Sequence, residues 1–243
     1  ELSGAGALLG LFALIERRVK DPMLPLGLFR VPAFAGAQIS AFAISASLFA
    51  VYLYATLYFQ HVLGLSAIEA GLVYVPGTIL NAVVSGMTAN LSGKVSARVM
   101  VSGGLALVSV GLLLMTTAGV DSSWTTLLPG LLIAMIGTGM FNPAVIAVAL
   151  GSVSEHQSGL AAGVNDTFRQ AGIAVGVAAL GAMIPTAALS TGDFGGYVDG
   201  LQHALVVGGA VAGIGAVAAA YLIRPSLRSQ RVSATAVAAE AGC

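Results

Sequence analysis

The sequence predicts an all-α fold: a polytopic membrane bundle of six helices, preceded by the end of one further helix. Of the 243 residues, 57% are hydrophobic and only 8% are charged, whereas about a quarter of the residues in a soluble domain are charged. Gly contributes 32 residues, which suits membrane helices whose backbones approach closely. Six apolar stretches are each long enough to cross about 30 Å of hydrocarbon.

The first element is an apolar run over residues 2–15 that would form about 21 Å of helix, which is too short to cross a bilayer. Arg17, Arg18 and Lys20 follow this run, whereas a secretory signal peptide carries its basic residues before the apolar stretch. We therefore expect residues 1–15 to be the tail of a truncated transmembrane helix. Residues 16–32 are then a cytoplasmic linker.

Six full-length spans follow, and together they define a transmembrane bundle over residues 33–223. Turn and capping residues separate the apolar stretches, and only the loop at 186–200 is longer. The Ala-rich segment 224–243 has no periodic pattern, so we expect a disordered cytoplasmic tail. The predicted spans are residues 33–59, 68–91, 99–120, 127–152, 160–185 and 202–223.

The basic residues predict the orientation of the bundle, because cytoplasmic loops carry the excess of Lys and Arg. With six spans, nine of them fall on one side: Arg17, Arg18, Lys20, Arg30, Lys94, Arg98, Arg224, Arg228 and Arg231. The opposite loops carry carboxylates at or near their ends but neither Lys nor Arg. Both ends of the bundle are therefore expected in the cytoplasm, with the chain in the plasma membrane, as in a bacterial inner membrane.

Several polar and aromatic residues near helix ends have structural explanations. Ser66 with Glu69, and Asp199 with Gln202, match the capping box that satisfies free backbone donors at a helix start. An aromatic belt at the membrane interface accounts for a further three residues. These are Trp124, Tyr58 and Tyr197.

Arg169 is the strongest candidate for a functional site. It lies about nine residues into the fifth span, or about 14 Å from its cytoplasmic end. A charge at that depth is costly unless it is paired or faces a wet cavity. Asp166 and Asn165 share its helical face. Two interpretations stay open: Arg169 lines or gates a transport pathway, or Asp166 and Arg169 form an ion pair that only holds helices together.

Prolines inside two spans are the second signal. Pro76 with Gly77 lies in the second span, and Asn142 with Pro143 lies in the fourth. Each proline frees a backbone carbonyl one turn back, and such kinks are typical of cavity-lining helices in transporters. The alternative is that the kinks serve only the packing of the helices and line no cavity.

The first span carries a polar and aromatic face. Gln38, Ser45 and Tyr52 recur at intervals of seven residues, with Phe42 and Phe49 on nearly the same side. Such a face can cradle an amphipathic ligand. It can equally be an ordinary contact between helices.

The sequence lacks the residues that other classes of function require. An intramembrane enzyme needs a nucleophile with a base, or a set of metal ligands. The three histidines fall at predicted helix ends, and the only cysteine is Cys243. The sequence has no phosphate-binding Gly-rich loop and no basic face for nucleic acid. We therefore expect no enzyme activity, cofactor, metal site or nucleic-acid partner.

A series of short motifs resembles one transporter family. The run Asp21-Pro22-Met23-Leu24-Pro25 with Leu28-Phe29-Arg30 resembles the segment that enters the carboxyl-terminal bundle of fourteen-helix drug:proton antiporters of the EmrB/QacA type, in the major facilitator superfamily. Later motifs match in order across residues 16–185. They are Tyr58-Phe59-Gln60, Val75-Pro76-Gly77, Leu128-Pro129-Gly130, Asn142-Pro143 and Asn165 with Arg169-Gln170.

The resemblance implies that this bundle is the second half of a major facilitator fold. It implies export of drugs or other amphipathic compounds in exchange for protons, by alternating access around a cavity shared with a missing amino-terminal half. The first and fourth spans would line that cavity, with the second and fifth beside them. The third and sixth spans would face lipid.

Two positions depart from the family pattern. The segment Gly93, Lys94 to Arg98 resembles the family's cytoplasmic gating loop, but Ser96 or Ala97 stands where an Asp is usual. Asp166 stands where the family more often has a small hydroxyl residue. The proton-coupling carboxylates of the family lie in the other half.

The sequence therefore predicts a membrane transport half with a pathway formed by Arg169, Asp166, Asn165, Gln38, Tyr52 and Asn142. Its expected partners are the lipid bilayer, the missing half, a small amphipathic substrate and protons. A non-transporting truncated remnant or a partner-binding membrane subunit is the alternative.

Overall fold

The structure is a computed structural model that describes residues 26–91 and 94–223, and within these ranges its regular secondary structure is helical throughout. The predicted all-α fold is thus confirmed. Residues 1–25, which include the predicted helix tail and most of the linker, lie outside the described ranges, as do Gly93 and the tail 224–243.

The first span is one continuous helix that contains two π-helical turns. A short 3₁₀ helix, η1 (Leu26–Arg30), leads into α2 (Pro32–Ile44). A π-helical turn, η2 (Ser45–Phe49), separates α2 from α3 (Ala50–Leu57), and a second one, η3 (Tyr58–Val62), ends the span. Each π turn holds more residues than an α turn, so the positions beyond it rotate about the helix axis.

Five further long helices follow. They are α4 (Ala67–Leu91), α5 (Ala97–Leu114), α6 (Leu128–Gly151), α7 (Ser158–Gly181) and α9 (Phe194–Leu222). A 3₁₀ turn extends α5 to Thr117, and the short α8 (Ala188–Thr191) lies in the loop before α9. Five of the six spans, all but α7, are apolar enough throughout to cross a membrane by length and composition. At 24 residues α7 is about 36 Å long, but it carries Asp166 and Arg169.

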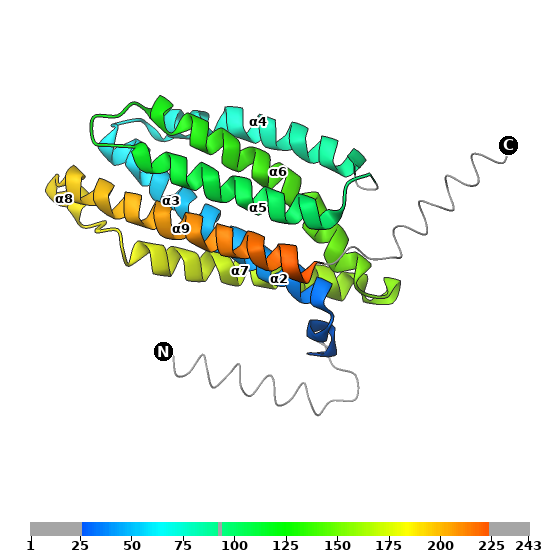
Figure 1. Cartoon of the computed structure of the whole chain (residues 1–243). Coiled ribbons are helices and arrows are strands. Elements are labelled where there is room, and N and C mark those ends of the chain that lie inside the picture. Colours follow the sequence, from blue (N-terminus) through cyan, green and yellow to red (C-terminus); the bar gives the residue numbers. More distant parts are fainter. Residues whose placement is uncertain (1–25, 92–93, 224–243) are drawn as a thin grey trace, which may run out of the picture.

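The long helices run side by side in one bundle (Figure 1). α5 packs against α6 on one side and α9 on the other, while α4 packs against α6. The first span contacts α6, α7 and α9 from behind α5. α4 and α7 therefore form two edges of the bundle, with the first span and α6 between them.

Glycines allow α5 and α6 to pack closely against each other. A methyl group on Gly104 would lie 2.6 Å from the carbonyl oxygen of Gly137, and one on Gly111 would lie 2.5 Å from that of Gly130. Both helices thus place glycines at intervals of seven residues on the facing sides. This close approach is the packing that the high glycine content indicated.

The predicted capping box at Ser66 is confirmed, whereas the one at Asp199 is wrong. The Ser66 amide donates to Glu69 Oε2 at 2.8 Å, and the Glu69 amide donates to Ser66 Oγ at 3.3 Å. α9 begins eight residues earlier than predicted, because Asp193 caps it by accepting from the Gly196 amide at 3.0 Å. Asp199 consequently lies inside the helix.

Two of the three residues assigned to an aromatic belt are buried instead. Tyr58 and Tyr197 are both 0% exposed, and their hydroxyls donate to the carbonyls of Gly119 and Tyr54 at 2.7 and 2.8 Å. The Tyr58 hydroxyl ties the end of the first span to the loop after α5, and the Tyr197 hydroxyl ties α9 to α3. Only Trp124 is exposed, as an interfacial residue should be.

Candidate functional site

Arg169 lies at the middle of α7, as the twelfth of its 24 residues. Its Nη1 donates to Oδ1 of Asn142 on α6 at 3.4 Å, and its Cζ lies 5.8 Å from the ring centre of Phe49 on η2. The guanidinium thus meets side chains from two other spans. The cation over an aromatic face adds an electrostatic attraction.

Asp166 does not neutralise Arg169 in this structure. The carboxylate is exposed and forms no ion pair or hydrogen bond with any residue of the described ranges. Both side chains instead line a cavity of about 170 Å³ between α6 and α7, together with Asn165. The Asp166–Arg169 ion pair, which was the alternative interpretation from the sequence, is thus absent among the described side chains, and neither charge neutralises the other.

Gln38 and Asn165 form a buried contact between the first and fifth spans. Asn165 Nδ2 donates to Gln38 Oε1 at 3.1 Å, and the two residues are 5% and 0% exposed respectively. Gln38 Nε2 and the Ser45 hydroxyl are buried and find no hydrogen-bond partner among the residues that the structure describes. Gln38 is therefore hidden between helices, where it positions α7 against the first span.

Close packing at two glycines also holds α7 against the first span. A methyl group on Gly172 would lie 2.5 Å from the Phe42 carbonyl oxygen and 2.9 Å from Ser45 Cβ, and one on Gly176 would clash with the backbone of Ala46. These two glycines give α7 a smooth surface that another helix can approach closely. Their close contact fixes the depth of Arg169 relative to the first span.

Tyr52 belongs to an aromatic cluster that joins the first span to α4. Its ring lies 4.7 Å from that of Tyr74, and its hydroxyl donates to Met135 Sδ at 3.4 Å. Phe49 and Phe59 pack against the two tyrosines at centroid distances of 6.4 and 5.7 Å. The cluster supplies a half-buried aromatic wall next to the residues around Arg169.

Sequence reasoning missed Tyr74 as a member of this cluster. Its hydroxyl hydrogen-bonds with the Thr56 hydroxyl at 3.0 Å, so it couples α4 to the first span. Asn81, seven residues further on, donates to the Met135 carbonyl at 3.2 Å. The interval of seven residues between these two polar groups was the available signal.

The two predicted kinks lie within uninterrupted helices. Pro76 is exposed in α4, and Gly77 beside it packs closely on Met135. Pro143 lies in α6 directly after Asn142, which binds Arg169. Kinking at these prolines stays a prediction.

The described part of the proposed gating loop is Lys94 and Arg98. Lys94 is exposed in the turn between α4 and α5, and its amide donates to the Leu91 carbonyl at 2.9 Å. Arg98 lies in the first turn of α5 and is half-buried.

Five long apolar helices packed around the helix that carries Arg169 define the class of this protein: a polytopic helical membrane protein with a polar site within its bundle. Residues 3–177 match the model of the Major Facilitator Superfamily, and the chain belongs to that family. The members are transporters and not enzymes, which confirms the expectation of no enzyme activity.

The curated relatives are drug-efflux and resistance proteins. The chain is 31% identical to the methylenomycin A resistance protein of Streptomyces coelicolor, over 93% of this chain and 46% of the relative. It is 31% identical to the puromycin resistance protein pur8 of Streptomyces alboniger, over 83% of this chain and 40% of the relative. It is 27% identical to the multidrug efflux pump LfrA of Mycolicibacterium smegmatis, over 70% of this chain and 34% of the relative. The chain spans less than half the length of each of these proteins.

Proposed function

We propose that this chain is the carboxyl-terminal half of a proton-coupled secondary transporter that exports drugs or other amphipathic small molecules by alternating access. An amino-terminal half of the same protein would complete the cavity. The similarity to efflux and resistance proteins, over less than half of their length, supports the class of substrate and the need for a second half.

One observation carries the proposal: the half-buried guanidinium of Arg169 in mid-helix without an ion-pair partner among the described residues. A charge at this depth persists where it faces a wet cavity or a ligand. Here it lines a cavity with Asp166 and contacts Asn142 and Phe49. Such a site can bind a polar group of a substrate whose apolar part lies on the aromatic wall of Tyr52 and Tyr74.

The edges of the bundle are consistent with a second half. In the 18-residue segment of α4 that suits a membrane, only 17% of the segment is buried within the bundle. Its exposed side is apolar, with Ile68 at 77% and Ile79 at 61% exposure. In the proposed transporter, α4 and α7 contact the other half while the first span and α6 line the cavity between them.

The orientation is also proposed from charge. Lys94 and Arg98 lie at one end of the bundle, whereas Asp121 lies in the loop at the other end of α5. Because cytoplasmic loops carry the excess of cations, Lys94 faces the cytoplasm. Both ends of the bundle then lie on that side of the plasma membrane.

Transport in inverted membrane vesicles tests this function. The vesicles come from cells that express the chain together with the coding sequence upstream of Glu1, and an imposed pH gradient drives uptake of a fluorescent amphipathic dye. We expect uptake that a protonophore abolishes. Uptake equal to that of vesicles without the protein, over a panel of cationic, neutral and anionic dyes, would instead favour a non-transporting membrane module.

A further inference from the structure

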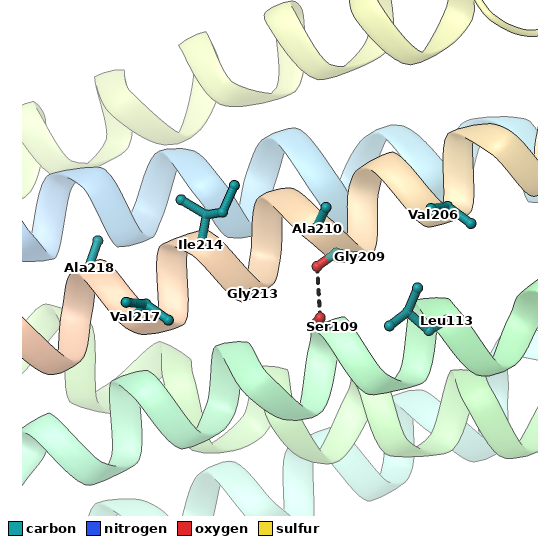
Figure 2. Close-up of a pocket in the computed structure, with 9 residues that line it drawn as sticks. All are labelled: Ser109, Leu113, Val206, Gly209, Ala210, Gly213, Ile214, Val217 and Ala218. Carbon is teal, nitrogen blue, oxygen red and sulfur yellow. Dashed lines mark hydrogen bonds between the residues drawn. The ribbon is translucent and has the colours of Figure 1, made fainter.

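A long groove runs along the outer face of the bundle between α5 and α9, away from the cavity that Arg169 lines. It has a volume of about 630 Å³, and nine residues line it (Figure 2). The walls are apolar, with Leu113 from α5 and Val206, Ile214 and Val217 from α9. Ala210 and Gly213 keep the groove open, because they project little or no side chain into it.

The groove offers no free polar group to an occupant. Ser109 is the single residue with a polar side chain among those that line it, and its hydroxyl donates to the Gly209 carbonyl at 2.7 Å (Figure 2). A buried polar ligand atom would therefore lose its hydrogen bonds to water without replacement. The lining therefore favours a hydrocarbon chain over a polar group.

The groove points toward a cation at one end of the bundle. Ser109 and Leu105 of α5 contact Gly209 and Gly215 of α9. Ala118, just beyond the end of α5, accepts from Gln202 near the start of α9, so the two helices are antiparallel. Arg98 lies eleven residues before Ser109, which is three helical turns along the same face, or about 16 Å away.

Tyr221 marks the same end on the other helix. It follows Val217 by four residues, so it lies on the groove side of α9, and it is 75% exposed. An exposed tyrosine at this position suits the membrane interface. Arg98 is half-buried, and within the described ranges no carboxylate pairs with it.

We propose that the groove between α5 and α9 binds an anionic phospholipid, with one acyl chain along the groove and the phosphate held by Arg98. The apolar lining suits an acyl chain. Arg98, which pairs with no carboxylate of the described ranges, suits the negative charge of the headgroup. On the proposed orientation this end lies in the cytoplasmic leaflet, where anionic lipids attract Lys and Arg. The site is independent of the cavity around Arg169, so it stands whether or not the protein exports drugs.

Photo-crosslinking in native membranes tests the site. A phosphatidylglycerol probe with a diazirine on its acyl chain is added to membranes containing the protein, and labelled peptides are mapped by mass spectrometry. We expect saturable labelling of α5 and α9, which unlabelled phosphatidylglycerol suppresses and phosphatidylcholine of the same chain length suppresses much less.

Three variants separate the parts of the proposal. Arg98→Gln should lower labelling of the groove about fivefold, because it removes one cation at the headgroup. Ala210→Leu should abolish the labelling by filling the groove. Ala82→Leu adds the same bulk at an exposed position of α4 and should leave the labelling unchanged.

Two results would overturn the proposal. Labelling spread evenly over the exposed faces of α5 and α9, with no response to Arg98→Gln or Ala210→Leu, would mean that only bulk lipid covers the face. Crosslinks from Val206 or Ile214 to a second polypeptide, lost in Ala210→Leu, would mean that a protein occupies the groove.

Discussion

Arg169 and its neighbours show how a charge is maintained inside an apolar bundle. The guanidinium has five donors, of which one is used on Asn142 at a long distance of 3.4 Å, and its charge lies over Phe49. These contacts are weak compared with a bidentate carboxylate pair. The residue therefore keeps most of its hydrogen-bonding capacity for a ligand or for water.

Substitution of Arg169 tests its role directly. Arg169→Ala should lower the rate of proton-driven dye uptake at least about tenfold, because a hydrogen bond to a charged group contributes that much to binding. Arg169→Lys should retain part of the rate, since it keeps the charge but loses the planar fork. The amount of protein in the membrane, measured on the same vesicles, is the control. A drop in protein amount with an unchanged rate per molecule would assign Arg169 a structural role.

The amide pair Gln38 and Asn165 should contribute to stability through hydrogen bonding between helices. Gln38→Leu leaves the Asn165 amide without its partner, so we expect the free energy of unfolding in detergent to fall by about 1 kcal/mol. The double variant Gln38→Leu with Asn165→Leu should recover most of that loss. Losses that simply add in the double variant would show that the two amides do not interact.

Single residues were predictable where the chemistry is local, and less so where packing decides. The mid-helix position of Arg169 and the Ser66 cap follow from sequence position alone. The partners Asn142 and Phe49 do not, because they come from distant spans. Tyr58 and Tyr197 were misassigned because a tyrosine near a helix end suits an interface and a buried contact equally well.

At the scale of helices, α7 depends on its glycines to reach the first span. Gly172 faces the Phe42 carbonyl at a distance that leaves no space for a side chain, whereas nothing lies within 4 Å of a methyl group placed on Gly163. The same helix therefore provides a sensitive position and a matched control.

Gly172→Ala should lower the free energy of unfolding by about 1 to 3 kcal/mol, because the added methyl group overpacks the helix contact. Gly163→Ala should leave it unchanged or raise it by up to about 1 kcal/mol, since alanine favours a helix. Thermal unfolding followed by circular dichroism in detergent measures both. Equal effects of the two variants would rule out the close contact of α7 with the first span.

The winding of the first span was not predictable from its residues. The seven-residue spacing of Gln38, Ser45 and Tyr52 assumes a regular α-helix, but the π turn Ser45–Phe49 rotates the later residues. Gln38 and Ser45 therefore pack against α7, while Tyr52 contacts Tyr74 and Met135. No composition rule locates a π turn, because it arises from contacts between helices.

At the scale of the whole molecule, the polar site, the orientation and the lipid groove all require six membrane crossings. Five helices satisfy that requirement by length and composition, and α7 is the sixth. Its polar residues reduce its hydropathy, yet they are the ones that form the proposed pathway. The crossing of α7 is therefore the point on which the account depends most.

Cysteine labelling from one side of the membrane tests that crossing most directly. Single cysteines replace exposed residues in a Cys243→Ser background: Lys94 and His156 at one end of the bundle, and Asp121 and Thr186 at the other. Intact cells are treated with a membrane-impermeant maleimide. The account predicts labelling at Asp121→Cys and Thr186→Cys, and protection at Lys94→Cys and His156→Cys until the cells are opened. Labelling of His156→Cys and Thr186→Cys from the same side would show that α7 does not cross the membrane and would contradict the account.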